Sequence, residues 1–122
     1  MTFMYWIDLG VDYRAIEVLL VSREVINTKS KDLGVYTQDD ETEGLWVPDE
    51  HSIYIVESPV HNTLEFILLH ELTHAFDDLC DMHETDENKV DCKAALLGAF
   101  LRENTELIDK IRRKELNKTD YV

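Results

Sequence analysis

Apolar residues near the start of the chain recur at the spacing of an amphipathic helix. Within residues 11–27 they fall near one stripe of a helical projection, whereas most of the charged side chains fall elsewhere. The stripe comprises Ala15, Ile16, Leu19, Leu20 and Ile26. We therefore predict a first helix over residues 11–27.

The next segment is rich in β-branched and aromatic residues. LGVYTQ (33–38) comes first, and LWVPDEHSIYIVES (45–58) then has strand-forming residues on both sides of Pro48 and Asp49. We expect two or three short antiparallel strands within residues 33–57, of which SIYIVE has the clearest strand composition.

The pattern changes to a helical period near residue 58. Either Ser58-Pro59 or Asn62 can begin a helix, and Asn62 followed three residues later by Glu65 matches a capping box. The apolar run LEFILLHELTHAFDDLCD (64–81) is therefore predicted to be a long helix.

The helical period breaks around DMHETD and then resumes. Thr85 or Asp86 can cap a further helix through ENKVDCKAALLGAFLRE (87–103), and TELIDKIRRKELNK (105–118) predicts a last helix. The sequence thus predicts one α+β domain over residues 1–122. In it, a small antiparallel sheet packs on the long helix, the N-terminal helix lies on the other side of that helix, and two C-terminal helices follow.

Charge and composition narrow the classes of function. Acidic residues outnumber basic residues 26 to 12, and the net charge of −14 disfavours nucleic acid and anionic membranes as partners. The apolar fraction of 44% is that of a folded globule. No run approaches the roughly 18 apolar residues of a membrane span, and MTFMYWIDLG has no basic residue to open a signal peptide. With Cys80 and Cys92 expected as reduced thiols, we predict a soluble cytoplasmic protein.

Two histidines and a glutamate interrupt the apolar central helix. His70 and His74 are four residues apart, so their imidazoles project from one face and can reach one ion. Glu71 lies about 100° further round, too far to share the ion but placed to hold a water attached to it. Metal sites are commonly bordered by apolar side chains that limit the access of water, and Leu68, Leu69, Leu72 and Ala75 can form such a border here. The segment HELTH therefore predicts a metal site of the HExxH type.

A catalytic zinc normally has three protein ligands, so the chain must supply another. The metzincin spacing would require a glycine at 77 and a histidine at 80, where Asp77 and Cys80 stand. The remaining candidates are Cys80, His83, Glu84, Glu87 and Asp91. In ENKVD, Glu87 and Asp91 are again four residues apart on one helix face. Glu87 can therefore ligate the metal while Asp91 accepts a hydrogen bond from a ligand histidine.

The stretch 53–101 resembles the gluzincin type of zinc peptidase. Its predicted elements follow the gluzincin order: the strand IYIVES, then the HExxH helix FILLHELTHAFDD, then the helix of DENKVDCKAALLGAFL, which opens with ExxxD. The layout is most similar to the ImmA/IrrE-like metallopeptidase domain; HELTH is also the thermolysin form, and HAFDD with ENKVD is similar to neprilysin. The resemblance implies a zincin-like fold and five roles: zinc ligation by His70, His74 and Glu87, catalysis by Glu71, and support of a ligand histidine by Asp91.

These features predict a minimal zinc metallopeptidase that hydrolyses a peptide bond through a zinc-bound water. A small domain leaves little room for a deep cleft, which favours a specific regulatory protein as the substrate. An extended substrate would pair with the exposed edge of the SIYIVE strand. Two alternatives stay open: a zinc-stabilised, non-catalytic binding module with a zincin fold, and an acidic mimic of DNA. Glu71 favours the peptidase, because a structural zinc site has no use for a base.

Overall fold

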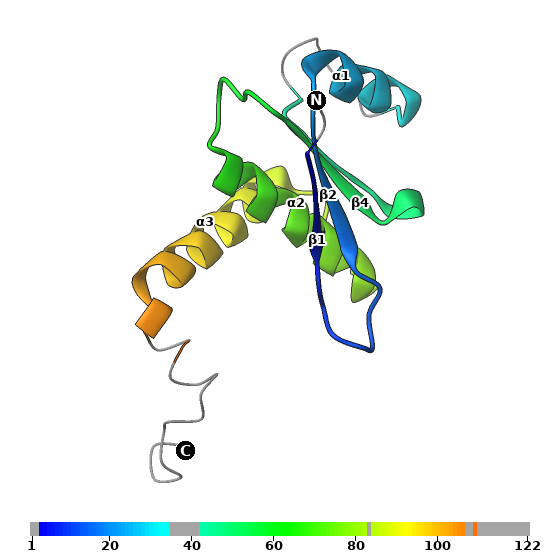
Figure 1. Cartoon of the computed structure of the whole chain (residues 1–122). Helices are drawn as coiled ribbons and strands as arrows, with labels where there is room; N and C mark the ends of the chain where they lie inside the picture. Colours follow the sequence, from blue (N-terminus) through cyan, green and yellow to red (C-terminus); the bar gives the residue numbers. More distant parts are fainter. Residues whose placement is uncertain (1–2, 35–41, 83, 107–108, 110–122) are drawn as a thin grey trace, which may run out of the picture.

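The computed structural model describes residues 3–34, 42–82, 84–106 and 109 (Figure 1). Within these ranges the chain forms strands β1 (Phe3–Ile7), β2 (Ile16–Val21), β3 (Gly44–Val47) and β4 (Ser52–Val56), helices α1 (Arg23–Asp32), α2 (Leu64–Leu79) and α3 (Glu87–Glu103), and a 3-10 turn η1 (Pro48–Glu50). The expected α+β class is confirmed. The expected strand over 33–38 and the last helix over 105–118 lie mainly outside the described residues.

The strands form one mixed sheet in the order β1-β2-β4-β3. β1 and β2 are antiparallel, as are β3 and β4, but β2 and β4 are parallel. The expectation of a purely antiparallel sheet is therefore wrong. The expectation that SIYIVE offers a free edge is also wrong, because β4 is hydrogen-bonded to β2 on one side and to β3 on the other.

The predicted helix over 11–27 is wrong across residues 16–21, which form β2. Ile16 and Val18 alternate along this strand and pack into the core beneath α2, whereas Val21 packs on the opposite face of the sheet. Pairing to β1 and β4 satisfies the backbone of β2 on both sides, which outweighs an apolar pattern that fits either period. The helix begins only after Ser22, whose hydroxyl accepts a hydrogen bond from the Val25 N–H.

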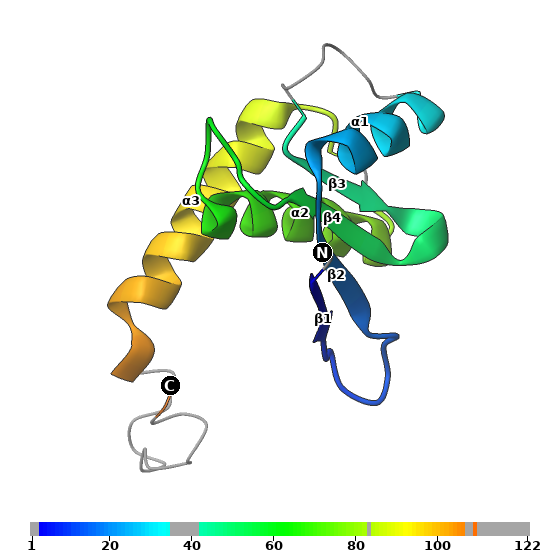
Figure 2. The ribbon, with the colours of Figure 1, turned by 45° about the horizontal axis from the view of Figure 1, so that its top comes forward.

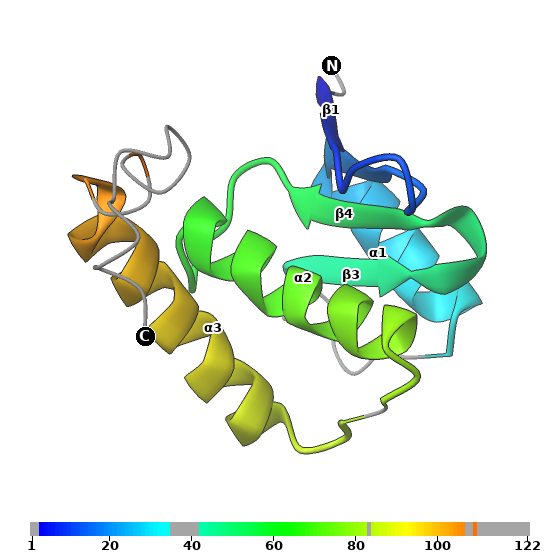
Figure 3. The ribbon, with the colours of Figure 1, turned by 90° about the horizontal axis from the view of Figure 1, so that it is seen from below.

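The sheet separates α1 from α2, as Figure 3 shows. β3 and β4 contact α1 on one face and α2 on the other, and α3 packs against α2. The sequence predicted that the first helix lies on the side of α2 away from the sheet. This prediction is wrong, because α1 lies on the side of the sheet away from α2. The β1–β2 hairpin extends beyond the rest of the sheet (Figure 2), and Met4, Tyr5 and Trp6 are exposed on it. Among the described helices, none is long and apolar enough to cross a membrane.

The cap of α2 differs from the predicted one. Thr63 rather than Asn62 caps this helix, and its hydroxyl accepts a hydrogen bond from the Phe66 N–H at 3.1 Å. Asn62 instead donates both its backbone N–H and its side-chain amide to Glu43. The cap of α3 is Asp86, one of the two residues predicted for it, and its carboxylate accepts from the Asn88 N–H.

A buried carboxylate fixes the loop that leads into α2. Glu43 is only 5% exposed and accepts hydrogen bonds from the backbone N–H groups of Val60, His61 and Asn62 at 2.6, 3.0 and 3.1 Å. Burial alone would raise the pKa of Glu43, but these donors and the Asn62 side chain together hold it below its ordinary value. The ionised Glu43 therefore ties the start of β3 to the loop that precedes α2.

Replacing Glu43 tests this tie. Glu43→Gln should lower the free energy of unfolding at neutral pH by about 1–3 kcal/mol, because donors that served a carboxylate lose their charged acceptor. The folded pKa lies below the ordinary value of 4.5, so the stabilisation is present above that pH and is lost as the pH falls through the folded pKa. Urea unfolding across this range should show the variant and the unmodified chain converging in acid. Glu57→Gln, an exposed carboxylate near the same loop, is the control and should change little.

Candidate metal centre

α2 brings its two histidines together on the face that looks toward α3. The ring centroids of His70 and His74 are 5.0 Å apart, and one ligand atom from each, with one from Glu71, lie within 4.8 Å of one another. The two histidine side chains are 20% and 24% exposed, so they are accessible but sit against a largely buried helix. The spacing predicted for two imidazoles on one helix face is therefore present.

Glu87, the first residue of α3, reaches both imidazoles. Its two carboxylate oxygens lie 2.9 Å from His70 Nε2 and 3.3 Å from His74 Nε2. Four ligands arranged tetrahedrally around zinc at about 2.0–2.2 Å would be separated by about 3.3 Å from one another. Two imidazole nitrogens and one carboxylate are also a common donor set of catalytic zinc sites. The residues present therefore fit a zinc ion, and the assignment of His70, His74 and Glu87 as its ligands stays a prediction.

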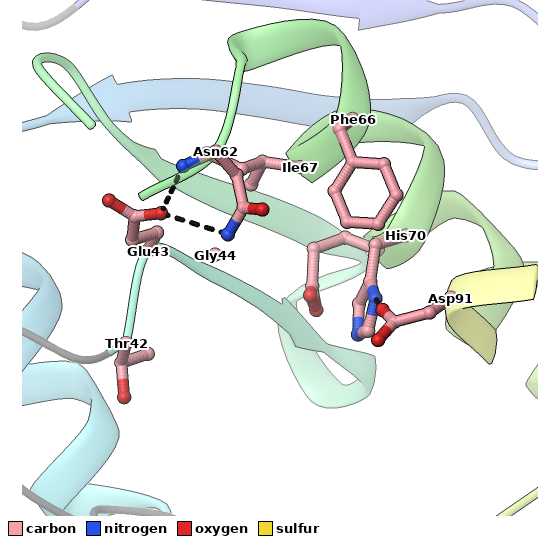
Figure 4. Close-up of a pocket in the computed structure, with 9 residues that line it drawn as sticks. Thr42, Glu43, Gly44, Asn62, Phe66, Ile67, His70 and Asp91 are labelled. Atoms are coloured by element: carbon pink, nitrogen blue, oxygen red, sulfur yellow. Dashed lines mark hydrogen bonds and ion pairs between the residues drawn. The ribbon is translucent and has the colours of Figure 1, made fainter. Parts of the chain in front are cut away.

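Asp91 lies one turn further along α3 and contacts the other nitrogen of His70. The distance from Asp91 Oδ1 to His70 Nδ1 is 2.8 Å, as the dashed line in Figure 4 marks. A hydrogen on Nδ1 donates to this carboxylate, which leaves the Nε2 lone pair directed toward Glu87. The structure thus brings Asp91 to one of the two histidines predicted as ligands, and its role in orienting that histidine stays a prediction.

Small residues on α3 let it approach α2 closely enough for these contacts. Val90, Ala94 and Gly98 are spaced four residues apart and are buried. A Cβ on Gly98 would lie 3.1 Å from Leu69 Cδ1, which is tight. Because Glu87 and Asp91 flank the first of these residues, the packing stripe places both carboxylates beside the histidines.

The other candidates for a third ligand lie elsewhere or outside the described residues. Glu84 faces Lys89, with 3.5 Å between the carboxylate and the ammonium. Cys80 caps the end of α2 and is an exposed free thiol, as is Cys92. His83 is outside the described residues. The structure therefore brings Glu87 to the histidines, and it places Glu84 beside a lysine.

Glu71, on α2, is buried against β3, with 6% of the residue exposed. Burial raises the pKa of its carboxyl group above the usual range, while the nearby imidazoles of His70 and His74 act in the opposite direction. A backbone hydrogen bond from Trp46 also favours the ionised form. A carboxyl group with raised proton affinity therefore lies next to the imidazoles.

Two hollows of about 260 and 360 Å³ flank the histidines. Gly44, His70 and Glu71 line both hollows. Phe66 and Asp91 also line the first hollow. The further lining residues of the second include Trp46, His74, Asp78 and Glu87. Figure 4 shows the first hollow, with Glu43 and Asn62 on one side and His70 on the other. The two hollows together form a shallow cleft along β3.

Sequence reasoning missed the contribution of β3 to this cleft. Gly44 and Trp46 carry no motif, and only the crossing of β3 over α2 places them beside Glu71. Tyr54 on β4 donates to Glu50 and packs on the α1 side of the sheet, away from this cleft.

Comparison with protein-family models, with curated proteins and with solved structures found no match. The functional interpretation of this chain therefore rests on the geometry of the site and on the sequence motif.

Removing Glu87 should strip the metal. We expect Glu87→Ala to weaken zinc binding by more than the roughly 10–100-fold that loss of an outer hydrogen-bond partner costs, because a direct ligand disappears. Metal content and zinc affinity, measured by competition with a chelator, check this. Glu84→Ala and His83→Ala are matched controls from the same segment and should bind zinc normally. Loss of zinc from either control with retention in Glu87→Ala would mean that the third ligand is misassigned.

Removing Asp91 should also weaken zinc binding, but by less than the removal of Glu87. Asp91→Ala should weaken zinc binding about 10–100-fold, because His70 keeps its ligand nitrogen but loses the partner that orients its ring. Lys93→Ala, an exposed neighbour on α3, is the control. Equal zinc affinity in the Asp91→Ala variant and the unmodified chain would show that the contact with His70 does not support metal binding.

Proposed function

We propose that the chain is a minimal zinc-dependent metallopeptidase with a zincin-like fold of the gluzincin type. The observation that carries the proposal is the convergence of His70, His74 and Glu87, with the carboxyl group of Glu71 buried beside them. In this proposal Glu71 is the base and not a ligand. A binding site for metal alone would not require this fourth group.

The division of labour follows from this arrangement. His70, His74 and Glu87 would hold the ion, which when bound supplies Lewis-acid chemistry that polarises a carbonyl and makes water more acidic. Glu71 accepts the proton of the attacking water and delivers it to the departing amine nitrogen. Asp91 holds His70 in the tautomer whose Nε2 is free to ligate.

Among the described residues β3 is an edge strand of the sheet, and its outer edge suits an extended peptide. Leu45 and Val47 pair with β4, and the Glu43 carbonyl accepts a hydrogen bond from the Val56 N–H. Alternation along an antiparallel strand then turns the N–H and C=O of Gly44 and the C=O of Trp46 toward the other side, where the cleft lies, while the Trp46 N–H is engaged by Glu71. A substrate strand added along β3 would pass over Glu71 and the histidines. This edge replaces β4, which is interior, as the proposed docking strand.

The substrate class follows from the size of the cleft. Hollows of about 260 and 360 Å³ accommodate individual side chains rather than a folded partner. An extended segment of a specific regulatory protein is therefore the proposed substrate.

A zinc-stabilised, non-catalytic binding module is the second candidate. The apolar residues that α3 leaves exposed favour it: Leu96, Leu97, Phe100 and Leu101. Zinc held between α2 and α3 would stiffen the helix that carries these side chains, and a partner could cover them. The burial of Glu71 favours the peptidase over this module.

Two substitutions separate chemistry from folding. Glu71→Gln should retain zinc and thermal stability but abolish peptide cleavage, because the amide fits the space and cannot accept a proton. His74→Ala should lose zinc, and with it the stability that metal binding to the folded chain provides. Zinc stoichiometry, thermal unfolding and cleavage of a peptide library are measured on both variants and on the unmodified chain.

The outcomes of this comparison are distinct. Full cleavage by Glu71→Gln would rule out the proposed mechanism. An unmodified chain that binds one zinc ion tightly but cuts neither the peptide library nor a set of unfolded proteins would favour the binding module.

A further inference from the structure

We infer that Trp46 is a positioning residue that clamps β3 to α2 at two points and thereby fixes the orientation of Glu71. The inference rests on the proposed function for the role of Glu71, whereas the clamp itself is a matter of geometry. It involves a residue that lies outside the HExxH and ExxxD motifs.

The first point of the clamp is the indole of Trp46. Its Nε1–H donates to Asp78 Oδ2 at 2.5 Å, in a part-buried contact between residues 32 positions apart in the chain. Asp78 lies one helical turn beyond His74 on α2. The ring of His51 packs edge-on against the indole, with 5.4 Å between the centroids. The indole is therefore held between α2 and the turn that joins β3 to β4.

The second point is the backbone of Trp46. The neighbours Leu45 and Val47 pair with β4, so the N–H of Trp46 faces the open edge of the sheet. The Glu71 carboxyl group lies against this part of the strand, since the Glu71 Cγ is 3.0 Å from where a Cβ on Gly44 would stand. The Trp46 N–H acts on the pKa of Glu71 as a hydrogen-bond donor. Glu71 and Asp78 are seven residues, or about two turns, apart on α2, so both face the same strand.

Close approach of the strand and the helix makes both contacts possible. A Cβ on Gly44 would lie 2.6 Å from Ile67 Cγ2 and 3.0 Å from Glu71 Cγ, closer than a side chain allows. Glycine at this position therefore lets β3 lie directly on α2 beside Glu71. Trp46, two residues further along, then reaches both carboxylates.

The clamp has a consequence for the cleft. The Trp46 N–H constrains the Glu71 carboxylate, one oxygen of which lies within 4.8 Å of a ring nitrogen of His70 and of His74. The carboxylate is thereby held in one orientation before a substrate arrives, which reduces the reorganisation needed during reaction. Loss of the indole contact would let β3 shift along α2 and would relax this orientation without removing any metal ligand.

Hydrogen exchange tests the clamp without any assay of activity. Trp6 and Trp46 are the two tryptophans of the chain, so ¹⁵N-tryptophan labelling gives two indole and two backbone signals, and Trp6→Phe assigns them. Glu71→Ala should speed exchange of the Trp46 backbone N–H at least about tenfold, because its acceptor is lost. Asp78→Leu should do the same for the Trp46 indole N–H. The signals of Trp6 should be unchanged in both variants.

Unchanged exchange of the Trp46 backbone N–H in Glu71→Ala would overturn the inference. So would unchanged exchange of the indole N–H in Asp78→Leu. Either result can be obtained whether or not the chain cleaves peptides, so failure of the clamp is distinguishable from failure of the proposed peptidase.

Kinetics then separate positioning from simple packing. Trp46→Phe keeps an aromatic ring but removes the indole donor, and we expect kcat to fall about tenfold with KM and zinc stoichiometry unchanged. Asp78→Leu should match it, and the double variant should lose no more than either single variant, because the two residues form one contact. Asp78→Asn keeps an oxygen acceptor and should recover part of the rate lost in Asp78→Leu.

Trp6→Phe is the matched control, since Trp6 is 61% exposed on β1 and far from the cleft in the sheet order. If Trp46→Phe lowers only the melting temperature and leaves kcat unchanged, Trp46 is a packing residue and the inference is wrong. If the unmodified chain shows no cleavage, the proposed function fails, and the exchange measurements still decide the clamp.

Discussion

The packing of α3 against α2 is the contact on which the candidate site depends. Neither helix alone carries a complete donor set, because α2 supplies imidazoles and α3 supplies the carboxylates of Glu87 and Asp91. Their close approach gathers negative charge around Glu71, in a chain whose net charge is already −14. Carboxylates brought together repel one another unless a cation or a proton intervenes. A divalent cation between the histidines and Glu87 would relieve this repulsion and lock the two helices together.

The sheet constrains the other side of α2. Gly44 removes the side chain that would hold β3 away from Glu71, and Glu43 ties the same end of β3 to the loop before α2. These adjacent residues thus serve different purposes. Gly44 sets how closely β3 approaches α2, and Glu43 sets the position of the loop from which α2 begins. The cleft is therefore formed by an edge strand whose position is determined by interactions with α2 and with the loop that precedes it.

Elements whose signal is local were predictable from sequence, and elements that depend on distant partners were not. The HExxH helix, the SIYIVE strand and the Asp86 cap are each marked by residues within a few positions, and the structure has all three. β2 was mistaken for helix because IEVLLV fits both periods, and its pairing partners lie elsewhere in the chain. Asn62 was mistaken for a cap because Glu43, 19 residues away, engages it instead. For the site, the contact between Asp91 and His70 followed from helical spacing, whereas the roles of Gly44 and Trp46 required knowledge of the strand order.

The energetic cost of Glu71 bears on the choice between a peptidase and a binding module. A carboxyl group that is 6% exposed and has a raised pKa destabilises the fold when it is ionised, because water solvates the charge better than the protein interior does. An apolar side chain at this position would pack against β3 without that cost. Zinc bound by His70, His74 and Glu87 would be held without help from Glu71, so the metal site does not account for its presence. A proton acceptor beside the ion is useful when a proton has to be moved, and hydrolysis of a peptide bond requires that step. The burial of Glu71 therefore favours a chemical role for the site over a purely structural one.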